Sequence, residues 1–165
     1  MKDALHFEEL LGYAESETRH WRDWFERYPA ALAVKTEVAT AGNALTLVFH
    51  IAYVELYFAS HLLGVPYLDY KTMKYGSIEE LFAIFDQSQG KLRRFLKDAK
   101  KADWEKLVEL GSHGEFTVPP VTKRKCFAHV LLHGTRHWAQ LATELRAAGY
   151  KQDWQHDFLF TEAMD

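Results

Sequence analysis

Residues 126–149 read Cys-Phe-Ala-His-Val-Leu-Leu-His-Gly-Thr-Arg-His-Trp-Ala-Gln-Leu-Ala-Thr-Glu-Leu-Arg-Ala-Ala-Gly, and this stretch predicts a long amphipathic helix. Its apolar side chains recur at steps of three and four, which is the spacing of one helix face. Gly149 supplies the expected stop, and Arg146 places a cation in the last turn, where the helix dipole favours positive charge. We therefore expect a helix with one buried face.

Three histidines, His129, His133 and His137, follow one another at intervals of four residues in this helix. Side chains four residues apart are stacked neighbours, with Cβ atoms about 5–6 Å apart, so two successive imidazoles can share one ion. The spacing predicts one half of a metal site. An alternative stays open, because histidines at this spacing can instead be satisfied by backbone carbonyls or water. A third ligand elsewhere in the chain would favour the metal.

An apolar stretch from about residue 44 to residue 63 predicts a second long helix, with capping residues at 40–43 and a stop at Gly64. Two histidines lie on its inward face. His50 is flanked in sequence by apolar side chains, whereas His61 lies in the last turn, where a protonated imidazole would suit the helix dipole. His50 is therefore the better candidate for the third ligand.

The N-terminal residues 3–28 predict another amphipathic helix, which Pro29 ends. It contains the pattern Glu17-x-x-His20, which in four-helix di-iron proteins supplies ligands from each of two helices. A second copy of the pattern is absent from the sequence. A di-iron centre is therefore disfavoured, and we interpret Glu17 and His20 as residues of the helix surface.

A third helix is predicted from Ser77, which forms a capping-box pattern with Glu80, to about Ala99. The periodic pattern is lost over about residues 100–120, which predicts a long crossover loop with a short hairpin around residues 111–114. We expect an all-α fold, a four-helix bundle with this crossover loop before the last helix. The whole chain, residues 1 to 165, is expected to form a single domain.

Composition narrows the class of protein. The hydrophobic fraction of 48% and charged fraction of 26% are ordinary for a soluble globular domain, and a formal charge of −3 gives no electrostatic basis for binding nucleic acid. The single cysteine, Cys126, excludes an internal disulfide and fits a reducing compartment. We see no signal peptide and no uninterrupted membrane span, so we expect a cytoplasmic protein. The aromatic-rich tail, residues 150–160, is expected to pack on the bundle.

Three segments of the sequence resemble the DinB/YfiT-like family of metalloenzymes. They are residues 41–56, which include His50; Leu62-Leu-Gly64; and His129-x3-His133-Gly-Thr-Arg-His137-Trp-Ala-Gln140 with the later Leu-Arg-x-Ala-Gly149. The resemblance covers about residues 1–160 and implies a four-helix bundle that holds a divalent metal with one histidine of the second helix and two of the last. On this chain these ligands correspond to His50, His133 and His137.

One departure from the family pattern follows the last ligand. Many members have Arg-Gly-Gln there, whereas this chain has Trp138-Ala139-Gln140, so the role of the family's arginine is not carried over. His129 matches a position that is often histidine in the family without being a usual ligand. We interpret it as a residue beside the ligands or in the core.

The resemblance implies a metal-dependent enzyme, of the thiol S-transferase or hydrolase type, in which three histidines leave a coordination position open. Zinc or nickel is the expected ion, although imidazole also suits copper and iron. The expected partners are a small-molecule substrate, such as a low-molecular-weight thiol, and a second copy of the chain in a homodimer.

Glu55 is the candidate catalytic residue, because it follows His50 by five positions and could orient a ligand or move a proton; a surface carboxylate is the alternative. The rival class of function is a non-enzymatic helical bundle with a structural or adventitious metal that acts through self-association.

Overall fold

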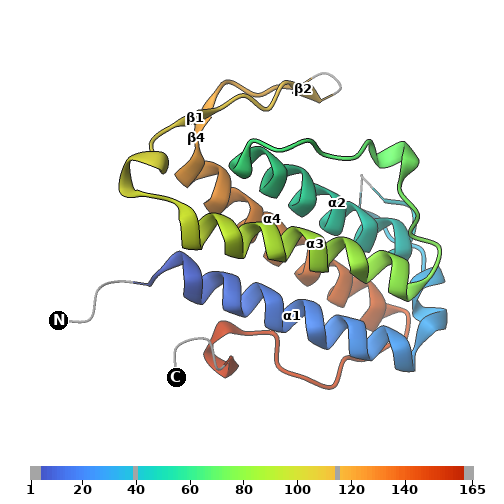
Figure 1. Ribbon diagram of the computed structural model, residues 1–165. Helices are drawn as coiled ribbons and strands as arrows, with labels where there is room; N and C mark the ends of the chain where they lie inside the picture. The colour runs from blue at the N-terminus through green and yellow to red at the C-terminus, as the bar shows by residue number, and fades with distance from the viewer. Residues whose placement is uncertain (1–4, 39–40, 114–115, 162–165) are drawn as a thin grey trace.

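The computed structural model describes residues 5–38, 41–113 and 116–161, and this part of the chain contains four long helices packed side by side (Figure 1). They are α1 (Phe7–Arg27), α2 (Ala44–Leu63), α3 (Ile78–Asp98) and α4 (Lys123–Ala147). Short 3₁₀ segments lie in the connections, at Pro29–Ala33, Tyr70–Thr72 and Lys101–Asp103, and in the C-terminal tail, at Phe158–Phe160. The predicted all-α four-helix bundle is confirmed.

The helix boundaries follow from the capping residues. The side-chain oxygen of Asn43 accepts a hydrogen bond from the backbone N–H of Thr46 over 2.9 Å, which satisfies a free donor at the start of α2. Ser77 does the same for Glu80 at the start of α3, over 3.1 Å. Gly64 ends α2 in the left-handed conformation, with φ of 67°, which residues with a Cβ atom rarely adopt.

The crossover between α3 and α4 is a narrow antiparallel arm that runs alongside α2 (Figure 1). Ser112–His113 pairs with Phe116–Thr117 where the hairpin was predicted, although Gly114 of that prediction lies outside the described residues. A second strand pair at the base, which the sequence did not predict, closes the arm. The hydroxyl of Tyr57 on α2 donates a hydrogen bond to the carbonyl oxygen of Leu110 over 2.5 Å and ties the arm to the bundle. The strands are β1 (Leu107–Val108) paired with β4 (Val121–Thr122), and β2 (Ser112–His113) paired with β3 (Phe116–Thr117).

Helix α2 is the central helix of the bundle. It is long and apolar enough to cross a membrane by length and composition, but 56% of its apolar window is buried inside the protein, as in the core helix of a soluble bundle.

The core to which α2 contributes contains several large aromatic rings. Trp21 of α1 and Trp138 of α4 stack with ring centroids 5.3 Å apart, and Phe85 of α3 stacks on the other side of Trp138. These contacts fix α4, and with it the histidines it carries, relative to the other helices.

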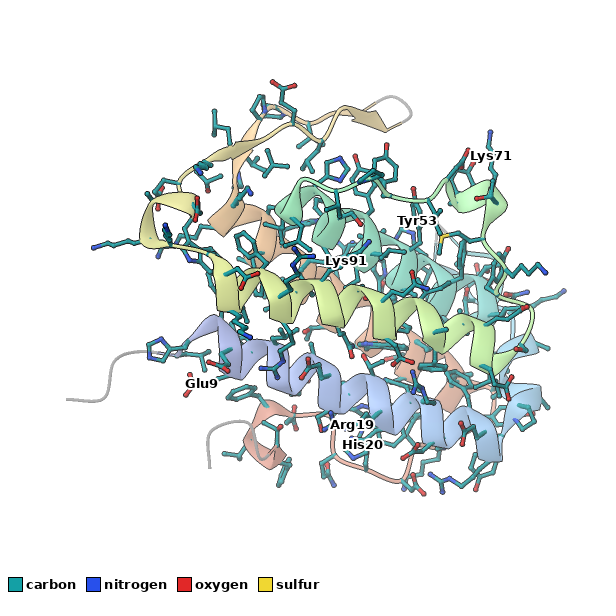
Figure 2. The ribbon with its side chains drawn as sticks, viewed as in Figure 1. Glu9, Arg19, His20, Tyr53, Lys71 and Lys91 are labelled. Atoms are coloured by element: carbon teal, nitrogen blue, oxygen red, sulfur yellow. The ribbon has the colours of Figure 1, made fainter. Side chains whose placement is uncertain are left out.

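The C-terminal tail returns along α1, as its aromatic content predicted (Figure 1). The Nε1–H of Trp154 donates to one carboxylate oxygen of Glu17 over 3.0 Å, and Nδ1 of His156 lies 2.9 Å from the other. Glu17 is consequently only 5% exposed, and its interpretation as a surface residue is wrong. His20 is exposed beside the tail, as predicted, with its ring 5.5 Å from that of Trp154 (Figure 2).

Candidate metal centre

His50, His133 and His137 lie together where α2 packs against α4. Each offers one ring nitrogen, and these three nitrogens all lie within 4.8 Å of one another. The ring centroids of His50 are 5.1 Å from His133 and 5.0 Å from His137, while the two rings of α4 are 4.4 Å apart. The structure thus brings together the three histidines that the family resemblance implied. Spacing of four residues places two of them on one face of α4, and helix packing adds the third.

All three imidazoles are held in the neutral form. Burial lowers the pKa of His50 to about 4 and that of His133 to about 3, and the neighbouring imidazole of His137 adds to both shifts. Burial lowers the pKa of His137 as well, and this residue is only 4% exposed. A neutral imidazole has a free lone pair, so at neutral pH no proton has to leave before these nitrogens bind a cation.

Two polar side chains of α4 fix the orientation of the His137 ring. Nδ1 donates to the side-chain oxygen of Gln140 over 2.6 Å, and the guanidinium of Arg136 donates to Nε2 over 3.1 Å. The lone pair of this ring is therefore on Nε2. Gln140 could have been identified from its position, three residues after the last histidine, whereas the contact of Arg136 depends on a side-chain conformation that the spacing does not specify.

The cluster ends with these three residues. Within the described parts of the chain no cysteine, aspartate or glutamate joins it to supply a fourth ligand. His61 is directed elsewhere, because its Nδ1 lies 2.8 Å from the carbonyl oxygen of Tyr57 on its own helix. His129 is exposed and therefore not in the core; its ring centroid lies 5.8 Å from that of His133 and 5.0 Å from that of Phe58. It lies beside the three clustered histidines.

Trp138, which follows His137 where the resemblance led us to expect an arginine, belongs to the core. It is 6% exposed and stacks between Trp21 and Phe85. The side chain at this position therefore points away from the histidines and into the bundle. Its function on this chain is packing.

Glu55 does not lie with the three histidines. Its side chain is buried, with 6% exposed, so the alternative interpretation as a surface carboxylate is also wrong. Burial raises its pKa to about 7, although the hydrogen bond from Ser88 opposes the shift. The hydroxyl oxygen of Ser88 lies 2.5 Å from the carboxyl of Glu55 and 3.0 Å from the carbonyl oxygen of Phe85. Ser88 donates to Glu55 when the carboxyl is ionised, whereas a protonated Glu55 can donate to Ser88 and leave the Ser88 hydroxyl to donate to Phe85.

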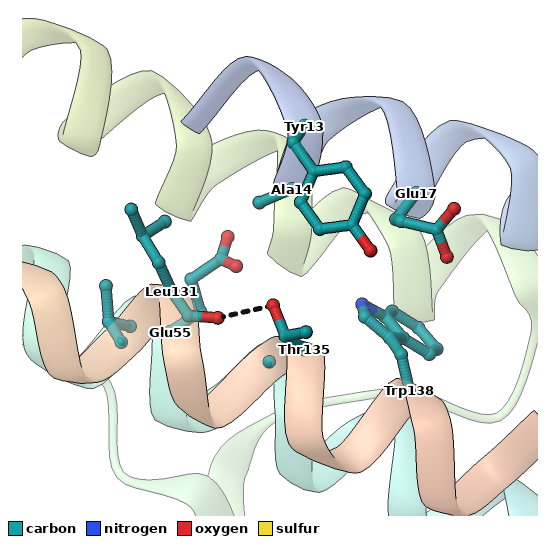
Figure 3. A pocket seen from close by; sticks show the side chains of 9 residues that line it. Tyr13, Ala14, Glu17, Glu55, Leu131, Thr135 and Trp138 are labelled. Carbon is teal, nitrogen blue, oxygen red and sulfur yellow. Dashed lines mark hydrogen bonds between the residues drawn. The ribbon is translucent and has the colours of Figure 1, made fainter. Parts of the chain in front are cut away.

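Glu55 lines a small cavity between α1 and α4 (Figure 3). The cavity has a volume of about 10 Å³, room for one water molecule. Across it lie Tyr13 and Glu17 of α1, and Thr135 of α4, whose hydroxyl donates to the carbonyl oxygen of Leu131 over 3.0 Å. This cavity is part of the bundle interior, and none of the three clustered histidines lines it.

Comparison with known proteins gives a family and a structure of similar fold. A search of curated proteins finds none with significant similarity to the chain. The crystal structure of YjoA, a DinB-like protein from Bacillus subtilis, has a similar fold, with a TM-score of 0.56 and 15% sequence identity over 87% of this chain and 99% of that one. The profile of the DinB family matches residues 1–164. The chain therefore belongs to the DinB family.

Proposed function

We propose that this protein is a metal-dependent enzyme whose divalent ion is held by His50, His133 and His137. One observation carries the proposal: three neutral imidazole nitrogens from two helices lie within 4.8 Å of one another, with no fourth protein ligand among the described residues. Structural zinc sites are closed by four protein ligands, whereas catalytic sites have three and leave a position for water or substrate. Three ligands therefore favour a catalytic site over a structural one.

The residues fit the proposed ion. Nitrogens that share a tetrahedral zinc ion at 2.0–2.1 Å lie about 3.4 Å apart, so ligand atoms within 4.8 Å need only small side-chain rotations to converge. Imidazole suits zinc and nickel, which are the metals we propose. The hydrogen bond from Nδ1 of His137 to Gln140 also fits, since a ligating histidine usually donates its other N–H to an acceptor that fixes the ring.

A bound divalent ion would supply a Lewis acid able to polarise a substrate or lower the pKa of a water or thiol. The protein's own residues orient the three histidines and shield them from water. Gln140 fixes the ring of His137, and the aromatic core behind Trp138 keeps water from the buried side of the cluster. His50 is partly exposed, so the remaining approach is from the outer side of the α2–α4 interface.

We propose a small-molecule reaction of the thiol S-transferase or hydrolase type, with a low-molecular-weight thiol as one substrate. Membership of the DinB family and the open three-histidine cluster support this class. We expect the reacting group to occupy the open coordination position. Glu55 has no part in this proposal, because it lies in the bundle interior and is not a member of the cluster.

The test uses the protein purified without a histidine tag. Its zinc and nickel content is measured, and turnover of 2-mercaptoethanol with an alkylating electrophile, and of a panel of esters and amides, is compared before chelation, after chelation and after reloading. We expect turnover that disappears on chelation and returns with metal, while the melting temperature changes little. Loss of the fold on chelation would favour a structural ion, and turnover that is independent of metal would reject a metal-dependent enzyme.

A further inference from the structure

A second concavity, which we call the arm pocket, lies between α2, α4 and the strand arm. It has a volume of about 210 Å³ and is distinct from the histidine cluster, none of whose members lines it. Its walls are mostly apolar. The residues that define it are Phe58 of α2, Leu110, Val118 and Val121 of the arm, and Lys125 and His129 of α4.

The chemistry of the arm pocket suits a compact apolar group. Its volume is below the roughly 300–1,000 Å³ of pockets that enclose drug-sized ligands. Burial raises the pKa of Cys126, another lining residue, to about 12, so its thiol is neutral. The polar side chains that remain are His129 and the exposed Lys125, whose positive charge favours a neutral or anionic ligand over a cationic one.

The arm pocket is connected to the candidate metal centre through His129. The ring of His129 lies 5.0 Å from Phe58 in the pocket wall and 5.8 Å from the metal-centre residue His133, measured between ring centroids. These two positions on α4 are four residues, or about one helical turn, apart, which is about 6 Å along the axis. A single small molecule can therefore reach both the pocket and the histidine cluster.

The walls of the pocket are fixed in place by contacts at the base of the arm. Tyr57 donates to the carbonyl oxygen of Leu110, and the side chains of Tyr57, Val108 and Leu110 form a small apolar cluster of their own. Lys123, in the first turn of α4, donates to the last turn of α2 at the carbonyl oxygen of Leu62 over 2.5 Å. A preformed pocket binds a ligand without the entropic cost of ordering its walls.

We infer that the arm pocket binds the apolar group of the substrate, while the reacting end of the same molecule lies at the histidine cluster. The substrate is then a neutral or anionic small molecule with a compact apolar group about one helical turn from its reacting atom. This inference rests on the proposed function, because it assigns a substrate class to that site.

The first experiment needs no metal. Amide NMR spectra of the chelated protein are recorded during a titration with toluene, an apolar probe of suitable size. We expect saturable shifts at Val121 and His129. Absence of such shifts would overturn the pocket assignment whether or not the protein binds a metal.

The second experiment uses the cobalt-loaded protein, in which a thiolate bound to the ion gives a charge-transfer absorption band. We expect 2-phenylethanethiol to bind at least tenfold more tightly than 2-mercaptoethanol. Val118→Trp and Pro119→Trp, which fill the pocket from the arm, should each remove this preference and leave mercaptoethanol binding unchanged. The control Leu107→Trp alters an exposed position on the same arm, outside the pocket, and should keep the preference.

The outcomes separate the two proposals. Equal binding of both thiols by the cobalt-loaded wild-type protein would overturn the inference and leave the metal site standing. Failure to bind cobalt at all, together with saturable toluene shifts, would reject the proposed function while retaining an apolar pocket. Retention of the preference in both tryptophan variants, with the fold verified by their NMR spectra, would place the apolar group elsewhere.

Discussion

The guanidinium of Arg136 donates a hydrogen bond to Nε2 of His137 over 3.1 Å. The other ring nitrogen, Nδ1, donates to Gln140, so its lone pair is not available. Nε2, which accepts the hydrogen bond from Arg136, is therefore the nitrogen with the available lone pair. An ion bound by His137 needs that lone pair, and it is also repelled by the positive charge of Arg136. Metal binding must therefore move Arg136 away from the ring, which its exposed position on α4 permits.

Replacement of Arg136 should strengthen metal binding. One hydrogen bond contributes about 0.5–1.5 kcal/mol net, so Arg136→Leu is expected to lower the dissociation constant for Zn²⁺ by about 2- to 10-fold. Competition titration against a chelator measures this, with Arg124→Leu as the control for loss of an exposed cation from the same helix. A weaker or unchanged affinity would show that the arginine does not compete with the ion.

Replacement of Gln140 should have the opposite effect. Gln140→Leu removes the acceptor that fixes the ring of His137, and loss of such a partner typically costs about 10- to 100-fold in metal affinity. The same competition titration measures it, with the exposed Gln155→Leu as control. An affinity within about twofold of wild type would mean that core packing alone orients His137.

The burial of Glu55 predicts a pH dependence of stability. Its pKa is raised from 4.5 to about 7 in the folded protein, so between these values the folded state binds more protons than the unfolded state. The free energy of unfolding therefore falls as pH rises through this window, by about 3 kcal/mol for this group, and is constant above it.

The variant Glu55→Gln isolates this contribution, because it stays neutral at every pH. We expect it to be more stable than wild type by about 2–3 kcal/mol at pH 8 and close to wild type at pH 4.5. Urea unfolding at several pH values provides the comparison, with the exposed Glu26→Gln as control. A difference between Glu55→Gln and wild type that does not change with pH would mean that Glu55 is ionised in the folded protein.

Glu17 fixes the C-terminal tail to α1. Glu17→Ala leaves the N–H groups of Trp154 and His156 without their acceptor, so we expect a loss of about 1–3 kcal/mol in unfolding free energy. Proteolysis after residue 150 should also become faster. Metal content should stay the same, because Glu17 is not part of the histidine cluster. Cleavage at the wild-type rate would show that the aromatic contacts hold the tail without the carboxylate.

Local sequence patterns predicted the helices, and the spacing of His129, His133 and His137 predicted one half of a metal site, because both depend on spacing along one helix. The resemblance to the DinB/YfiT-like family then selected His133 and His137 from this run. Gly64 and Asn43 mark the ends of α2 by their own backbone and capping chemistry, and His133 and His137 share a face by their separation. His50 was selected because apolar neighbours leave it little water. Reasoning of this kind uses only residues that are close in sequence, so it cannot predict contacts between distant segments.

Contacts between distant segments could not be predicted in this way. Glu17 was assigned to the surface because the sequence lacks the second Glu-x-x-His pattern of a di-iron centre, but the tail, far away in sequence, covers it. Glu55 was linked to His50 by proximity in sequence, yet five residues of helix turn its side chain towards α3 and Ser88. The strand pair at the base of the arm, Leu107–Val108 with Val121–Thr122, also joins segments that no local pattern connects.

The metal content of single-histidine variants, purified without a tag and equilibrated with Zn²⁺, tests the central claim most directly. We predict one ion per wild-type chain and at least tenfold weaker binding in each of His50→Ala, His133→Ala and His137→Ala. His61→Ala should bind like wild type, because its ring is directed to the carbonyl oxygen of Tyr57. Equal metal content in all four variants would contradict the assignment of these three histidines as the ligands.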